Sequence, residues 1–211
     1  MSSITEPIRI QPFQPEHFPE VSRLLVHSFR GKFQALTKLS DDVLASFFNK
    51  LFHYYPSEDA SCRIVAIQED EVVGTLELKW YIPRAKEEPF PSWSAFREFG
   101  TWTIIKLLFG LQFLNHEPRV GECYISEVAV HPNHQGKGIG KLLLRWAMNY
   151  ACADERFDTL SLHVSHKNER ARMLYELLSF QTVRKESSLI RYLLFHERQW
   201  HFMTFKPYRS Q

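Results

Sequence analysis

Three glycines within five positions, Gly136, Gly138 and Gly140, limit the possible folds more than any other feature of this sequence. They follow a run at 124–130 with the alternation of a strand, and they precede apolar residues at helical spacing over 139–150. Glycine lets backbone N–H groups point into a turn without obstruction by a Cβ, and a helix start adds partial positive charge. A strand, a glycine turn and a helix in this order therefore predict an α/β unit with an anion-binding turn.

Strand and helix patterns alternate along most of the chain. Apolar residues at every second position mark strands, whereas apolar residues three and four positions apart mark helices. A helix after each of two central strands is typical of a mixed α/β layer. We therefore predict one domain over residues 1–211, of the α/β class (an α+β mixed sheet), with a central mixed sheet flanked by helices. The strand patterns lie at 8–13, 62–67, 72–82, 124–130, 159–164, 180–185 and 200–205, and the helix patterns at 18–29, 40–51, 139–150 and 168–178.

The charge balance and the cysteines narrow the class of protein. The 26 basic residues exceed the 24 acidic residues by two, which is too small an excess for a dedicated nucleic-acid binder. Cys62, Cys123 and Cys152 cannot all pair and have no CxxC spacing, which argues against a disulfide framework or a zinc knuckle. Residues 1–18 lack the basic start and apolar core of a secretion signal. We therefore expect a cytoplasmic globular protein that binds no nucleic acid.

Two common phosphate-binding motifs do not fit the glycine turn. A GxGxxG register from Gly136 requires glycine where Lys141 stands, so the turn is not the NAD fingerprint. Gly140 and Lys141 are followed by Leu142 instead of Ser or Thr, so the turn is not a P-loop either. Two readings remain at this point, a tight turn without a ligand and a turn for a different phosphate-containing ligand, and Lys137 and Lys141 add positive charge for the second.

The residues around the turn match a known pattern. The motif QGKGIG at 135–140, after the strand end VAVHP at 128–132, resembles the acetyl-CoA signature of the GNAT acetyltransferases. The run NERARMLY at 168–175 looks like the second half-site of that family, although Ser179 stands where the family usually has glycine. The order of elements over 121–206 also follows the family. The resemblance implies the GNAT acyl-CoA N-acyltransferase fold, and Ser179 puts the geometry of one turn in question.

The resemblance also implies where acetyl-CoA binds. The end of the strand should give backbone hydrogen bonds to the pantetheine arm, and the turn should hold the pyrophosphate. Asn168 should meet the pantetheine as well, whereas Tyr175 should stand near the thioester sulfur, where a phenol can protonate the leaving thiolate. The implied cofactor-binding residues are Val128, Ala129, Val130, Gln135, Gly136, Lys137, Gly138, Ile139, Gly140, Lys141 and Asn168.

Two arrangements compete for the role of the catalytic base beside Tyr175. Strict alternation puts Tyr124 and Glu127 on opposite faces of their strand, so both can point at the acetyl group only if a bulge intervenes. Tyr124 with His163 resembles a pair that serves a subgroup of protein N-terminal α-amine acetyltransferases. Glu127 resembles a common solution of the wider family, acting directly or through a water. Both remain candidates for the base. The alternatives also stay open that His163 is a structural histidine and that Glu127 is an ion-paired carboxylate.

The resemblance implies an N-acetyltransferase that moves an acetyl group from acetyl-CoA to a primary amine by direct attack within a ternary complex. The acceptor is a small-molecule amine or a protein amine. Two alternatives stay open, a non-catalytic acyl-CoA-binding sensor and a membrane-surface acyltransferase that uses longer acyl groups, and so does a homodimer. Acetyl-CoA is the expected cosubstrate. No metal is expected, because HxxH pairs at 131–134 and 163–166 are weaker signals than the usual spacing of zinc ligands.

Residues 83–121 form an aromatic-rich insertion in this order of elements. Apolar residues recur at every third position from Phe90 to Leu114. This period drifts around an α-helix by about 60° per step, so a bend is required, at Gly100 or Gly110. The apolar stretch is shorter than the ~20 residues that cross a bilayer, which argues against a membrane span, and it lacks the Lys/Arg-rich polar face of an interfacial helix. Three surfaces compete for it: the sheet of its own domain, a second subunit and a lipid interface. We predict the first, with a helical lid or wall over the acceptor end of the active site.

Overall fold

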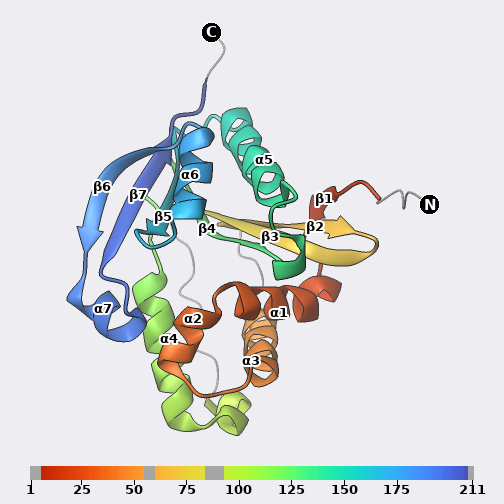
Figure 1. The fold of residues 1–211 in the computed structure, drawn as a ribbon, viewed down its shortest axis with the longest axis vertical. Helices are drawn as coiled ribbons and strands as arrows, with labels where there is room; N and C mark the ends of the chain where they lie inside the picture. Colours follow the sequence, from red (N-terminus) through yellow and green to blue (C-terminus); the bar gives the residue numbers. More distant parts are fainter. Residues whose placement is uncertain (1–5, 55–59, 84–92, 209–211) are drawn as a thin grey trace.

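The computed structural model describes residues 6–54, 60–83 and 93–208, and a mixed sheet lies at its centre (Figure 1). In these residues the sheet has seven strands in the order β1-β2-β3-β4-β5-β7-β6. Neighbouring strands are antiparallel except β4 and β5, which are parallel. The prediction of a mixed sheet flanked by helices is confirmed. The strands are β1 (Arg9–Pro12), β2 (Ser61–Gln68), β3 (Glu71–Trp80), β4 (Glu122–Val130), β5 (Thr159–Ser165), β6 (Gln181–Ser187) and β7 (Gln199–Phe205).

Helices cover both faces of this sheet (Figure 1). One face, the α5 face, carries α5 (Ile139–Ala153) and α6 (Glu169–Leu177). The other, the α1 face, carries α1 (Phe18–Ser28), α2 (Arg30–Leu36) and α3 (Asp41–Tyr54). The connection from β6 to β7 contains α7 (Leu189–Phe195). The sequence patterns predicted α1, α3, α5 and α6 but missed α2 and α7. Short 3₁₀ helices η1 (Pro15–His17) and η3 (Pro132–His134) precede α1 and α5.

Alternation along the strands divides the core between the two faces. On the α5 face, Leu76 and Leu78 of β3 pack with Leu143 of α5 and other fully buried apolar residues. On the α1 face, Val65 of β2 packs with Val21 of α1. Burial of apolar area on both faces stabilises the sheet.

The insertion is helical and packs mainly against other helices. The 3₁₀ helix η2 (Trp93–Phe99) is followed by α4 (Thr101–Leu114), and Gly100, with a φ of 80°, separates the two. The buried side chains Ile104 and Leu107 belong to a cluster with Phe47 of α3 and Leu36 of α2. The lid that we predicted is therefore not made by α4 itself, because its buried face is occupied by α2 and α3. Residues 84–92, which include Phe90, lie outside the described residues.

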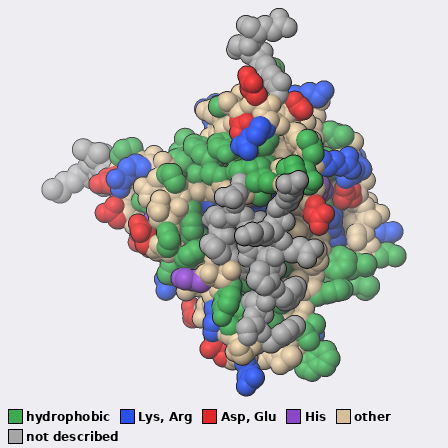
Figure 2. Space-filling view, turned by 180° about the vertical axis from the view of Figure 1, so that it is seen from behind, with side chains coloured by type: hydrophobic (Ala, Val, Ile, Leu, Met, Phe, Trp, Pro, Cys, Tyr) green, Lys and Arg blue, Asp and Glu red, His purple; other side chains and the backbone are tan. Residues whose placement is uncertain are grey.

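Apolar side chains also reach the surface on α4 and α7. Trp102 of α4 is 77% exposed and Leu193 of α7 is 75% exposed. Hydrophobic side chains gather at the right-hand edge of the molecule in Figure 2, the side on which these two helices lie. None of the helices in the described residues has both the length and the apolar character to cross a bilayer.

Two substitutions in α4 test its orientation. Leu107→Ala removes a fully buried side chain, and we expect it to lower the free energy of unfolding by about 2–5 kcal/mol. Trp102→Ala removes an exposed side chain on the opposite side, and we expect a change within about 0.5 kcal/mol. Denaturant unfolding of both variants measures the difference. Equal losses would contradict the packing of α4.

Candidate active site

Strands β4 and β5 separate over their second halves. They pair in parallel only over 122–125 and 159–162. Beyond these residues β4 continues beside β3 and β5 continues beside β7, so within the described chain no strand pairs with the two edges that face each other. An unpaired strand edge offers N–H and C=O groups to an extended ligand. Val128, Ala129 and Val130, which the sequence assigns to pantetheine binding, lie along this edge of β4.

A β-bulge decides which side chains of β4 share a face. The register shifts between Glu77 and Leu78 of β3, which leaves Ser126 of β4 as an extra residue. A bulge moves the alternation by one position. Tyr124 and Glu127 therefore both lie on the α1 face, whereas strict alternation would have put them on opposite faces. The bulge brings both candidate bases to the place where the strands separate.

The glycine turn after β4 has the geometry of an anion site. Gly136 and Gly138 have φ angles of 79° and 83°, and Gly138 is the N-cap of α5. A Cβ on Gly138 would meet no heavy atom within 4 Å. Lys137 and Lys141 flank the turn, and the Arg170 guanidinium lies 3.5 Å from the position of a Cβ on Gly136. An open helix N-terminus with three nearby cations suits the pyrophosphate of acetyl-CoA.

Other residues assigned to cofactor binding also hold the local structure together. Gln135 Nε2 donates to the carbonyl oxygen of Val130 at 3.3 Å, which ties the turn to the strand. Ile139 is buried in the core of the α5 face. A Cβ on Gly140 would lie in ordinary contact with the side chain of Leu174 in α6. Asn168 caps α6, because its side-chain oxygen accepts a hydrogen bond from the backbone of that helix at 3.2 Å.

Tyr175 of α6 lies on the α5 face, opposite Tyr124. Its side chain is buried beside Phe180, with ring centroids 6.0 Å apart. Burial raises the pKa of Tyr175 to about 12, so its phenol keeps its proton at neutral pH. The turn after α6 keeps the glycine-like geometry despite its serine, because Ser179 has a φ of 66°. The departure from the family pattern therefore introduces strain and not a different turn.

Tyr124 and His163 form a hydrogen-bonded pair on the α1 face. The Tyr124 hydroxyl lies 3.2 Å from His163 Nδ1, and His163 Nε2 lies 3.5 Å from Glu186 Oε1. Burial lowers the pKa of His163 to about 4, although the charge of Glu186 opposes the shift. Burial also raises the pKa of Tyr124. At neutral pH the pair therefore consists of a neutral imidazole and a protonated phenol.

Glu127 lies in a buried ion-pair network on the same face. Arg63 of β2 donates to Glu127 and lies 3.0 Å from Glu77 Oε1, while Ser126 Oγ donates to Glu77 Oε2 at 2.5 Å. Burial and the neighbouring charge of Glu77 raise the pKa of Glu127, against the attraction of Arg63. Burial alone would raise the pKa of Glu77. The charges of Arg63 and Lys79 and the hydrogen bonds from Ser126 and Arg63 outweigh burial and lower this pKa to about 2. One side of the Glu127 carboxylate is thus already occupied by Arg63.

Sequence reasoning missed four residues around the candidate bases. Arg63 donates to Glu127, Glu77 pairs with Arg63, and Glu186 contacts His163. His116, from the segment after α4, packs against Tyr124 and His163 with ring centroids 4.5 and 5.0 Å apart. None of the four belongs to a motif, so only the sheet register, and for His116 the packing of the segment after α4, could have found them. His116 thus brings the end of the insertion against the Tyr124–His163 pair, and the role of the insertion as a lid or wall stays a prediction.

A pocket of 270 Å³ adjoins this group on the α1 face. His116 and Phe202 line it, together with Arg119 and Arg184. The Phe202 ring lies 4.8 Å from the ring of His163. Tyr124 and His163 do not line the pocket, but both pack against His116, which does. Among the described residues, no group of three or more His, Cys, Asp or Glu side chains could hold a metal ion.

Comparison with known proteins gives one family and several relatives. The model of the acetyltransferase (GNAT) family matches residues 20–180. A segment of 61 residues is 41% identical to mycothiol acetyltransferase of Tsukamurella paurometabola, and it covers 29% of this chain and 20% of that enzyme. The similarity thus spans about a fifth of the length of this curated relative.

Two solved structures illustrate the likeness of the fold. Arabidopsis thaliana NAA60 in complex with acetyl-CoA has a TM-score of 0.60 and 16% identity, over 95% of this chain and 98% of that chain. The ribosomal-protein-S18-alanine N-acetyltransferase of Escherichia coli has a TM-score of 0.56 and 14% identity, over 97% of both chains. At these identities the similarity establishes the shared architecture of sheet and helices.

Proposed function

Because the chain belongs to the GNAT family of acetyltransferases, we propose that it transfers the acetyl group of acetyl-CoA to a primary amine by direct attack in a ternary complex. The observation that carries the proposal is the opening between β4 and β5. It ends at the glycine turn on one side and at the Tyr124–His163 pair on the other. One opening can therefore hold the donor beside a group that accepts a proton.

The residues for the donor follow from this arrangement. The edge of β4 at 128–130 would bind the pantetheine arm as an added strand, and the turn at 135–141 would bind the pyrophosphate. Acetyl-CoA supplies an activated acetyl group and a thiolate leaving group. Tyr175 of the α5 face retains its proton at neutral pH, and we assign to it the donation of that proton to the sulfur.

The acceptor must lose a proton on the α1 face, and we assign this task to Tyr124 and His163. The His163 imidazole is neutral at pH 7, and its Nδ1 is within hydrogen-bond reach of the Tyr124 hydroxyl. A proton from the amine can pass to Tyr124 while the phenol proton passes to Nδ1. Glu127 is the weaker candidate, because Arg63 already occupies its carboxylate.

The pH dependence of turnover tests this assignment. An α-amine acceptor has a pKa of about 8, and it reacts only when neutral. Since His163 is neutral above pH ~4, its titration does not limit the rate near neutral pH. We therefore expect kcat/KM to rise with the neutral fraction of the acceptor up to pH ~8 and then to level off. His163→Gln should lower that plateau by about a hundredfold without moving the limb.

Glu127→Gln is the comparison variant, with thermal unfolding as a check on its fold. We expect a smaller loss of kcat/KM than in His163→Gln, and the same rise of kcat/KM with pH as in the wild-type protein. If Glu127→Gln removes the plateau while His163→Gln keeps it, the base is Glu127 and the assignment to His163 is wrong.

A further inference from the structure

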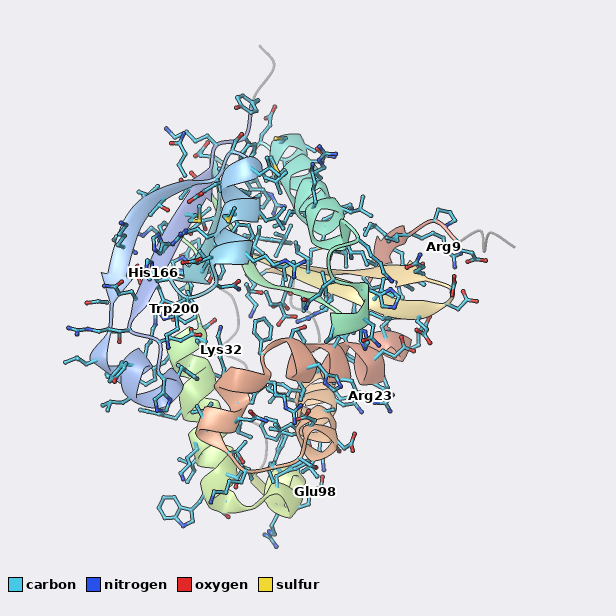
Figure 3. All side chains as sticks on the ribbon, viewed as in Figure 1. Arg9, Arg23, Lys32, Glu98, His166 and Trp200 are labelled. Atoms are coloured by element: carbon cyan, nitrogen blue, oxygen red, sulfur yellow. The ribbon has the colours of Figure 1, made fainter. Side chains whose placement is uncertain are left out.

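The ammonium group of Lys32 lies among aromatic rings. Lys32 Nζ of α2 lies 4.6 Å from the ring centre of Trp200 and 5.0 Å from that of Phe29. Within the described part of the chain, no carboxylate comes within 4.0 Å of it. Burial lowers the pKa of Lys32, and the charge of Glu197 opposes the shift. Figure 3 shows Lys32 and Trp200 next to each other, between α2 and the sheet.

The carboxylate whose charge acts on Lys32 belongs to Glu197. Glu197 Oε2 is buried and has no hydrogen-bond partner among the described residues. The backbone oxygen of Glu197 accepts from Trp200 Nε1 at 3.3 Å, so the segment is fixed against the same ring as Lys32. A buried polar atom without a partner is unfavourable, and such atoms in folded proteins usually have a function or a missing partner. A ligand group that accepts a hydrogen bond from Lys32 Nζ and donates one to Glu197 Oε2 would give both atoms a partner.

This pair lies on the acceptor side of the candidate site. Trp200 and Phe202 lie on the same face of β7, and their partners on β5 are Ser165 and His163. The Arg191 guanidinium lies 5.5 Å from the Trp200 ring. It also lies 3.3 Å from Glu186, the carboxylate that contacts His163. The contacts of Trp200, Arg191 and Glu186 thus lead from Lys32 to His163. Glu197 joins this layer through its backbone contact with Trp200.

We infer that Lys32 and Glu197 recognise the acceptor through a polar group that both accepts and donates a hydrogen bond, with Trp200 as the wall. An amide and a hydroxyl both have this property. The preferred acceptors are therefore amines that carry an amide or a hydroxyl close to the amino group, not plain alkylamines. The inference rests on the proposed function and names the class of acceptor for it.

Three probes separate the two sources of such a group. An alanine tripeptide amide supplies amides, glucosamine supplies hydroxyls and butylamine supplies neither. We expect the wild-type protein to acetylate at least one of the first two better than butylamine after each rate is divided by the fraction of neutral amine at the assay pH. Lys32→Met and Glu197→Gln should lower kcat/KM for that probe by about tenfold to a hundredfold, mainly through KM. Both variants should keep the rate for butylamine within about twofold.

The chain contains a matched control pair far from the site. Lys50 Nζ bonds Glu98 at 3.0 Å and lies over the rings of Phe96 and Phe99, and Figure 3 shows Glu98 at the far end of the helical layer from Lys32. Lys50→Met and Glu98→Gln should change none of the three rates by more than about twofold. Lys32→Arg keeps the charge and the donors, so it should retain part of the preference.

Several results would overturn the inference. It is wrong if the wild-type protein shows no preference for the polar amines, or if Lys32→Met lowers all three rates equally, as a purely structural role would. If no amine is acetylated, the proposed function fails separately. Calorimetric titration of the CoA-loaded protein with the tripeptide amide and with glucosamine then decides. Binding that Lys32→Met abolishes supports the inference, and absence of binding to the wild type refutes it.

Discussion

Gly138→Val is expected to abolish the rise in Tm that CoA gives the wild-type protein. At a hundred times its Kd, a ligand stabilises the folded state by about 2.7 kcal/mol, which corresponds to a rise of about 5–10 °C for a chain of this size. Gly138 has a φ of 83° and open space at its Cβ position. A valine would project where the pyrophosphate approaches, and it would also disfavour the left-handed backbone that starts α5. Thermal unfolding with and without CoA measures the effect.

Gly100→Val is the matched control for backbone strain. Gly100 is also an N-cap with a positive φ of 80° and little contact at its Cβ position, but it starts α4. We expect Gly100→Val to lower the Tm of the free protein while the rise with CoA persists. An unchanged rise with CoA in Gly138→Val would show that the turn does not hold the cofactor.

Tyr175→Phe is expected to lower kcat by at least about a hundredfold with little change in CoA binding. Removal of the hydroxyl deletes the proton donor to the leaving thiolate and keeps the buried ring that packs beside Phe180. Burial holds the pKa of Tyr175 at about 12, so the donor stays protonated throughout the usual pH range of an assay.

Tyr150→Phe serves as the comparison for the loss of a phenol elsewhere. Tyr150 lies on α5 and stacks on Trp80 and Trp146. We expect Tyr150→Phe to keep kcat within about twofold. If Tyr175→Phe also keeps the wild-type kcat, Tyr175 is a packing residue and the proton comes from elsewhere.

Local patterns predicted much of the fold because they depend on short stretches of chain. The strands at 124–130 and 159–164 and the helix at 139–150 were readable from periodicity, since each buries one face on the core. The helix α2 was missed because its seven residues give less than two full periods. The helix α7 has apolar residues on all sides, so its sequence, LIRYLLF, shows no helical stripe.

The arrangement of the candidate site depends on contacts between distant residues. A bulge at Ser126 reflects the register of β4 against β3, and no local signal in the sequence marks it. His116 reaches Tyr124 only because α4 ends beside the sheet. The pairing of Arg63 with Glu127 joins residues 64 positions apart. Motifs and the family resemblance therefore indicated the donor side and the candidate bases, while the residues around those bases required the three-dimensional structure.

One measurement tests the central claim most directly, namely the formation of an acetylated amine at the expense of acetyl-CoA. The protein is incubated with isotopically labelled acetyl-CoA and a panel of α-amines, lysine-type amines and small polar amines, and both free CoA and labelled amide are quantified by mass spectrometry. We predict equal amounts of the two products with at least one amine, and formation of both at least about a hundredfold more slowly in Tyr175→Phe. CoA binding without labelled amide from any amine would contradict the claim and identify the protein as an acyl-CoA-binding sensor.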